Sequence, residues 1–165
     1  MQTIDIIILI AASVLAGLGL LFGSKKKAGF GSGLFSLGAG VLLAILVNGS
    51  TSFYETVMAW FNWEAVPARW ASTILLAFLF TAAIAIILAL AARGITRTGA
   101  GVHLNGLLQG LFLTVGIALL TSTGFFFLSM SKNLGGLSWI QEGKSLMSSS
   151  ALLGWINETL STLVA

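Results

Sequence analysis

The chain has 165 residues, of which 57% are hydrophobic and 8% are charged, and its mean hydropathy is +1.02. A soluble domain carries roughly 25% charged residues, so this composition excludes a soluble globular protein and predicts one integral membrane domain over residues 1–165. The absence of cysteine excludes disulfides, thiolate metal sites and cysteine nucleophiles, and the small net charge of +3, divided along the chain, does not indicate nucleic-acid binding.

The first apolar run covers residues 4–22. A cleaved signal peptide is the alternative, but it would carry positive charge before its apolar region. Here the N-terminus carries Asp5, and the lysines Lys25, Lys26 and Lys27 follow the run. We therefore predict a first transmembrane helix over residues 4–22.

The second apolar run, residues 30–47, is about as short as a spanning helix can be. It is rich in glycine, which weakens an isolated helix but lets helices pack closely in lipid. A glycine-rich ligand loop is the alternative to a tightly packed helix. The small residues predicted to pack against a neighbouring helix are Gly29, Gly33, Ser36 and Gly40.

Residues 49–69 join the second and third apolar runs. Ser52 and Glu55 have the spacing of a capping box, and apolar residues then recur at helical spacing. We predict a short amphipathic helix over residues 53–63, lying in the membrane interface. Pro67 is expected to end this segment and to lead into the third run.

The third run, Trp70–Ala92, has 23 residues and no charge. As a helix it reaches roughly 34 Å, enough to cross a hydrocarbon core of about 30 Å. Its many alanines would allow neighbouring helices to approach closely. We predict that this helix is the packing spine of a four-helix bundle.

A glycine-rich turn, residues 94–104, precedes the fourth apolar run, residues 105–128. Gly106 and Gly110 form a GxxxG pair, which predicts helix packing. Asn105 and Gln109 are four residues apart and share one helix face. We expect them to hydrogen-bond to a neighbouring helix and not to form a substrate site.

The tail begins with a polar, glycine-broken segment, residues 129–144, and continues with an apolar stripe that predicts an amphipathic helix over residues 146–163. The predicted fold class is therefore an all-α integral membrane protein. It has four transmembrane helices, at about residues 4–22, 30–47, 70–92 and 105–128, and two interfacial amphipathic helices.

Charge distribution predicts the orientation. Five of the eight basic residues fall in the two short turns after the first and third runs: Lys25, Lys26, Lys27, Arg93 and Arg97. The positive-inside rule places these turns in the cytoplasm and both termini outside it. Tryptophan and tyrosine favour the interface, and the expected anchors all lie on the outer side: Tyr54, Trp60, Trp63, Trp70, Trp139 and Trp155.

The residues give little indication of chemistry. His103 is the only histidine, so a metal site lacks partners. Two serines, Ser32 and Ser122, sit in short motifs loosely like serine-protease elbows, but nothing places a base beside them. We therefore predict no enzyme, no catalytic or metal residue and no cofactor. Coupled transport is disfavoured because the second, third and fourth runs lack ionisable residues, whereas a passive pore or an accessory subunit remains open.

The layout resembles the CvpA family, the colicin V production proteins of bacteria. Residues 4–7 resemble the opening aspartate and apolar run of that family. Residues 19–23, followed by Ser36-Leu37, resemble the glycine-rich stretch that leads into its second helix. Thr98-Gly99 and the glycine-spaced fourth run resemble its TG turn and its fourth helix. The arginine-glycine-phenylalanine pattern, the aspartate-arginine pair and a later arginine of the family are absent here.

This resemblance implies a small inner-membrane protein that is non-catalytic and acts in an envelope or toxin-export assembly. Its partners would be the lipid bilayer and other membrane-protein subunits or further copies of itself, with no nucleic acid. A structural subunit of a larger membrane complex and a small oligomeric pore are the alternatives.

Overall fold

The computed structural model describes residues 2–24, 29–51, 53–130 and 134–164, and the elements in these ranges are all helices. They are α1 (Thr3–Phe22), α2 (Phe30–Thr51), α3 (Phe53–Phe61), α4 (Ala65–Ile95), α5 (Gly99–Met130), α6 (Ser138–Ser149) and α7 (Gly154–Val164). Four of them, α1, α2, α4 from Pro67 onward and α5, are long and apolar enough to cross a membrane. The helical class and the four apolar helices agree with the sequence, and they support a multi-pass membrane protein.

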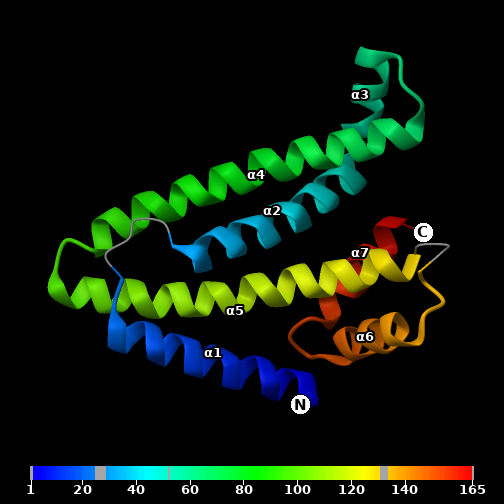
Figure 1. The fold of residues 1–165 in the computed structure, drawn as a ribbon. Coiled ribbons are helices and arrows are strands. Elements are labelled where there is room, and N and C mark those ends of the chain that lie inside the picture. The colour runs from blue at the N-terminus through cyan, green and yellow to red at the C-terminus, as the bar shows by residue number, and fades with distance from the viewer. Residues whose placement is uncertain (1, 25–28, 52, 131–133, 165) are drawn as a thin grey trace.

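The four long helices lie side by side in the order α1, α5, α2, α4 (Figure 1). The centre of this open row is formed by α2 and α5, while α1 and α4 are its edges. The prediction that Trp70–Ala92 is the packing spine of a bundle is therefore wrong. Residues 77–91 of α4 include no buried residue, because α4 packs mainly against α2 on one side and has no long helix on its other side.

Glycines bring α5 into backbone contact with both of its neighbours. A β-carbon at Gly106 would overlap the carbonyl oxygen of Gly19 in α1, and one at Gly110 would overlap that of Leu15. On the other side of α5, a β-carbon at Gly116 would lie 2.5 Å from the backbone nitrogen of Phe35 in α2. These positions admit only glycine unless the helices separate.

The small residues predicted in α2 divide into contacting and free positions. A β-carbon at Gly29 would meet the side chain of Gln109, and one at Gly40 would meet Thr81 of α4. Ser36 is fully buried. Gly33 is the exception, since a β-carbon there would have no neighbour within 4 Å. Gly31, two residues earlier, meets the backbone of α5, so the pair Gly29 and Gly33 does not form one packing face.

Several helices are longer than predicted, and a polar side chain extends one of them, α5, at its start. The side chain of Thr98 accepts a hydrogen bond from the Gly101 backbone N–H at 3.1 Å, so α5 begins at Gly99 and the predicted turn over residues 94–104 shrinks to residues 96–98. Pro67 lies inside the first turn of α4, where its missing N–H has no partner to lose.

The preceding helix, α3, ends at Phe61, and Asn62 then takes a φ of 51° that asparagine tolerates. Ser52, half of the predicted capping box, lies outside the described residues. The predicted single helix over residues 146–163 is two helices, α6 and α7, because Ser150 takes an extended conformation (ψ 130°) at the end of α6.

The described termini, α3, α6 and α7 all gather at one end of the row, which we call the termini end (Figure 1). The last turn of α1, the first turn of α2 and the turn after α4 lie at the opposite end, which we call the basic end (Figure 1). A hydrophobic core sits at the termini end, where α7 packs against α2 and α5. Its members are Leu42, Ile45, Leu119, Phe126, Met147, Leu153, Ile156 and Leu160. The tail is thus docked on the other helices through part of its apolar face.

Gly31 and Gly33 provide a matched test of helix contact, since they sit two residues apart in α2. We expect Gly31→Ala to destabilise the folded protein by about 1–3 kcal/mol, because its β-carbon would overlap the backbone of Gln109. Gly33→Ala should be neutral or slightly stabilising, since the added methyl group meets open space. Denaturant unfolding in detergent micelles would measure both, and equal effects would contradict this account of the α2–α5 contact.

Candidate functional site

The most concentrated polar feature of the termini end is a joint around Asp5. This side chain is 1% exposed and lies in the first turn of α1. One carboxylate oxygen accepts hydrogen bonds from the Ser150 hydroxyl and from the Leu152 backbone N–H at 3.3 Å. The other accepts from the backbone N–H groups of Gln2 at 3.0 Å and Ala151 at 3.2 Å. Asp5 therefore ties α1 to the turn between α6 and α7.

Ser150 completes this joint from the side of the tail. Its hydroxyl oxygen also accepts the backbone N–H groups of Leu152 at 3.2 Å and Leu153 at 3.1 Å. These groups precede α7 and would otherwise lack partners. Together Asp5 and Ser150 satisfy the backbone donors of residues 151–153, so the joint both links two helices and stabilises the turn.

A second polar cluster surrounds Asn48 near the end of α2. Its amide donates to the Thr73 hydroxyl at 2.9 Å, and its carbonyl oxygen accepts from the Ser72 hydroxyl at 3.1 Å and from the Tyr54 backbone N–H at 3.0 Å. Asn48 is 7% exposed and thereby connects α2, α3 and α4. Its bond to the Tyr54 N–H caps the first turn of α3 from a neighbouring helix.

Tyr54 belongs to this cluster as well as to the predicted interface anchors. The Arg69 guanidinium lies 4.4 Å from the centre of its ring and donates to its hydroxyl at 3.2 Å. The hydroxyl in turn donates to Glu55 at 3.3 Å. The predicted tryptophan anchors are all exposed and lie in or next to helices of the termini end: Trp60, Trp63, Trp70, Trp139 and Trp155.

At the basic end, polar side chains of α5 bind the turn after α1 and the start of α2. The Gln109 side-chain oxygen accepts the Ser32 backbone N–H at 2.8 Å, in the first turn of α2. The Asn105 amide donates to the Ser24 carbonyl at 2.9 Å. Both residues bond outside their own helix, as the sequence predicts. Arg93 lies in the last turn of α4 and Arg97 in the turn that follows, while Lys25, Lys26 and Lys27 lie outside the described residues.

None of the candidate catalytic residues assembles into a catalytic arrangement. The His103 Nδ1 lies 2.7 Å from the Leu20 carbonyl oxygen, so the ring serves the α1–α5 contact. Ser32 donates to the Gly29 carbonyl at 2.9 Å within its own helix turn. Ser122 lies 19 residues along α5 from His103, which is roughly 28 Å in a helix. Among the described residues, no group of three histidine, aspartate or glutamate side chains could hold a metal ion.

The termini end also buries polar atoms that lack partners. Asn157 in α7 is 5% exposed and donates to Ser122 at 3.4 Å, while its own side-chain oxygen and the hydroxyl of Thr123 have no partner in the described structure. Buried water fills such positions in many proteins. The arrangement provides only neutral oxygen and nitrogen atoms, so it offers no acid, base or charged ligand.

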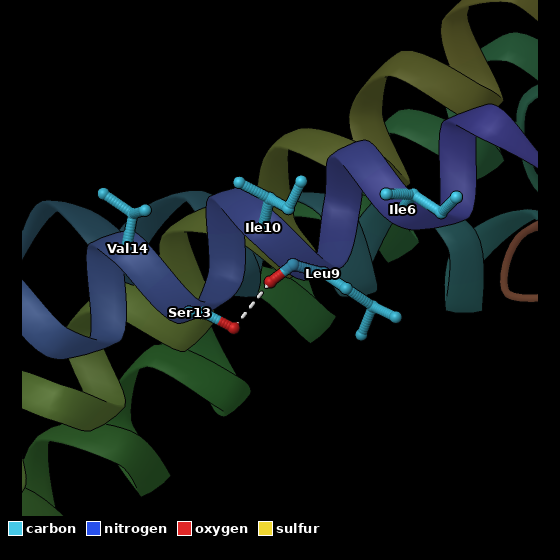
Figure 2. A pocket seen from close by; sticks show the side chains of 5 residues that line it. All are labelled: Ile6, Leu9, Ile10, Ser13 and Val14. Atoms are coloured by element: carbon cyan, nitrogen blue, oxygen red, sulfur yellow. Dashed lines mark hydrogen bonds between the residues drawn. The ribbon is translucent and has the colours of Figure 1, made fainter.

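Two apolar hollows lie along α1. The first is open and is lined by one face of α1, as Figure 2 shows, with Ser13 donating to its own helix at Leu9 (2.8 Å). The second is a cleft of about 210 Å³ between α1 and α5. Its walls are almost entirely apolar, and Met147 and Leu153 of the tail close it at the termini end. These hollows carry no reactive group.

Comparison of the chain with protein-family models, with curated proteins and with solved structures gives no match.

Asp5 is the residue whose role the sequence did not reveal. Its partner Ser150 is 145 residues away, and no pattern in the chain connects the two. The only signal in the sequence was an acidic side chain at the edge of an apolar run. Burying such a side chain in a membrane costs free energy unless it is paired or hydrogen-bonded. The sequence did not reveal the role of Asn48 either, because residues 48–51 have the composition of a polar linker, although they form the last turn of α2.

Asn48 and Ser50 allow the cluster at the end of α2 to be tested in one helix turn. We expect Asn48→Ala to destabilise the protein by about 1–3 kcal/mol, since it leaves the Tyr54 N–H without its partner and removes the hydrogen bonds that tie α2 to the hydroxyl groups of α4. Ser50→Ala should change stability by less than about 0.5 kcal/mol, because its exposed hydroxyl bonds only to its own helix. Thermal unfolding in detergent would compare them, and a neutral Asn48→Ala variant would refute the structural role of the cluster.

Proposed function

We propose that this protein is a non-catalytic membrane subunit that works by assembling with other subunits or with copies of itself. The resemblance to the CvpA family points to an envelope or toxin-export assembly in the bacterial inner membrane. The observation that carries the proposal is the open row of helices, in which residues 77–91 of the edge helix α4 include no buried residue. A closed bundle would have covered this helix on several sides.

The polar side chains support the same proposal. Those in the described helices are largely committed to holding helices together, as at Asp5, Asn48 and Gln109. A transporter or an enzyme would keep polar groups free to meet a substrate. A subunit needs only a rigid shape and faces that fit its neighbours.

The exposed face of α4 offers a suitable contact. Ala83 is exposed near the middle of the helix, among large exposed side chains such as Leu79, Ile86 and Ile87. A small residue among large ones leaves a notch in the surface, and small residues are common where membrane helices approach closely. We place the contact with a neighbouring subunit at this notch.

This assembly would sit with both termini outside the cytoplasm. The basic end carries Arg93 and Arg97, and the positive-inside rule favours a cytoplasmic position for such turns. The exposed tryptophans of the termini end would then lie at the outer interface.

The assembly is tested by extracting the protein from native membranes into polymer-bounded nanodiscs and measuring its mass. We expect a complex of fixed stoichiometry. Ala83→Trp should weaken association about 5- to 150-fold, which corresponds to the 1–3 kcal/mol of an overpacked contact. Phe78→Trp is the control, because it changes one large exposed side chain of the same helix for another.

A strictly monomeric protein would refute the assembly, whereas a complex unaffected by Ala83→Trp would remove α4 from the contact. Leakage of a dye from liposomes that contain the purified protein would instead favour the pore alternative.

Orientation is tested with single cysteines, since the chain contains none. Ser145 lies exposed in α6 and Ala100 lies exposed in the first turn of α5, at opposite ends of the row. We expect a membrane-impermeant maleimide to label Ser145→Cys in spheroplasts with intact inner membranes and Ala100→Cys only after permeabilisation. The reverse pattern would place both termini in the cytoplasm.

A further inference from the structure

The first helix, α1, is attached to the rest of the protein at two separated places. Near the basic end its backbone meets α5 directly, at Gly19 against Gly106 and at Leu15 against Gly110. At the termini end it is held by the hydrogen bonds of Asp5 to the turn between α6 and α7 and, more weakly, by Ile4 and Ile8, which pack partly buried against the hydrophobic core. Between these places lies the apolar cleft, and Figure 1 shows α1 diverging from α5 toward the termini end.

From this geometry we propose that Asp5 is a latch that holds α1 closed against the tail, and that its release lets α1 pivot about the glycine contact and widen the cleft. The proposal concerns the motion of one helix within the chain. It does not depend on the assembly proposed above.

The chemistry of the latch suits a contact that can open. A buried carboxylate is costly unless its charge is compensated, and the described partners of Asp5 are hydrogen-bond donors and not a cation. Three of these four donors belong to residues 150–152 and are lost when α1 moves away. Water can replace them at the membrane surface, so opening exchanges one set of hydrogen bonds for another.

Packing identifies α1 as the part that moves. Within α1 only Asp5 and Ala16 are buried. The tail is fixed, because Ile140 of α6 and Ile156 and Leu160 of α7 are fully buried. When α1 swings outward, the aliphatic walls of the cleft exchange protein contacts for lipid chains, which are equally apolar. The hydrophobic effect therefore opposes the motion of α1 only slightly.

Asparagine at position 5 removes the latch with little change in shape. Each carboxylate oxygen of Asp5 accepts two hydrogen bonds. An amide keeps one acceptor oxygen and turns an NH₂ group toward the remaining two donors. Asp5→Asn should therefore shift α1 toward the open position, while Glu158→Gln, an exposed position in α7, removes the same charge without touching the latch.

The motion can be measured by pulsed electron paramagnetic resonance in lipid nanodiscs, since the absence of cysteine allows spin labels at chosen pairs. One pair, Ile6→Cys with Val115→Cys, reports the latched half of α1. The other, Leu21→Cys with Leu104→Cys, reports the glycine contact. All four native side chains are exposed. In Asp5→Asn we expect a longer distance for the first pair, with the open-to-closed ratio raised about tenfold or more, and an unchanged distance for the second.

Glu158→Gln should leave both distances as in the unsubstituted protein. An Asp5→Asn variant with an unchanged first distance would overturn the latch. If neither label pair of the Asp5→Asn variant kept a defined distance, the pivot would be overturned, because Asp5 would then support the whole fold and not the position of one helix.

Discussion

Close backbone approach of α5 to two neighbours is the constraint on which the rest of the structure depends. Inside a membrane the hydrophobic effect does not drive helices together, because lipid chains are as apolar as leucine, so association relies on packing and hydrogen bonds. In α5, Gly106 and Gly110 face α1 while Gly116 faces α2. A helix with glycine on both sides fixes two contacts at once, and it orders α1, α5 and α2 into a row to which α4 is added at the edge.

Several polar side chains in this row share one role: each binds the free backbone N–H groups at the start of another helix. The first backbone N–H groups of a helix have no partner within it, and here side chains from other helices supply several of these partners. Gln109 of α5 binds the first turn of α2, and Asn48 of α2 binds the first turn of α3. Asp5 of α1 binds the turn that leads into α7. Each such contact satisfies a helix end and connects two helices, which explains why so few polar residues hold seven described helices together.

The sequence predicted the helical class, the four long apolar helices and the hydrogen bonding of Gln109 outside its helix, because each depends on composition or local periodicity. It did not predict the order of the row. Alanine-rich Trp70–Ala92 and the glycine-rich α2 both satisfy the pattern of a packing helix, and only three-dimensional contact shows that Gly31 faces α5 while Gly33 faces away. The two-helix tail was missed for a similar reason, since the apolar stripe continues across Ser150 and gives no local sign of the break.

The separation of the two partners in the Asp5 joint has a consequence for biogenesis. Asp5 leaves the ribosome well before Ser150, which follows 145 residues later. The glycine contact between α1 and α5 can form once Gly110 has been inserted, but the outer end of α1 must wait, with its carboxylate hydrated, until the tail has been made. Of the four long helices, α1 is thus made before the other three and secured after them. A chain that stalls before residue 150 would carry α1 with one attachment only, a form that quality-control proteases could distinguish from the finished protein.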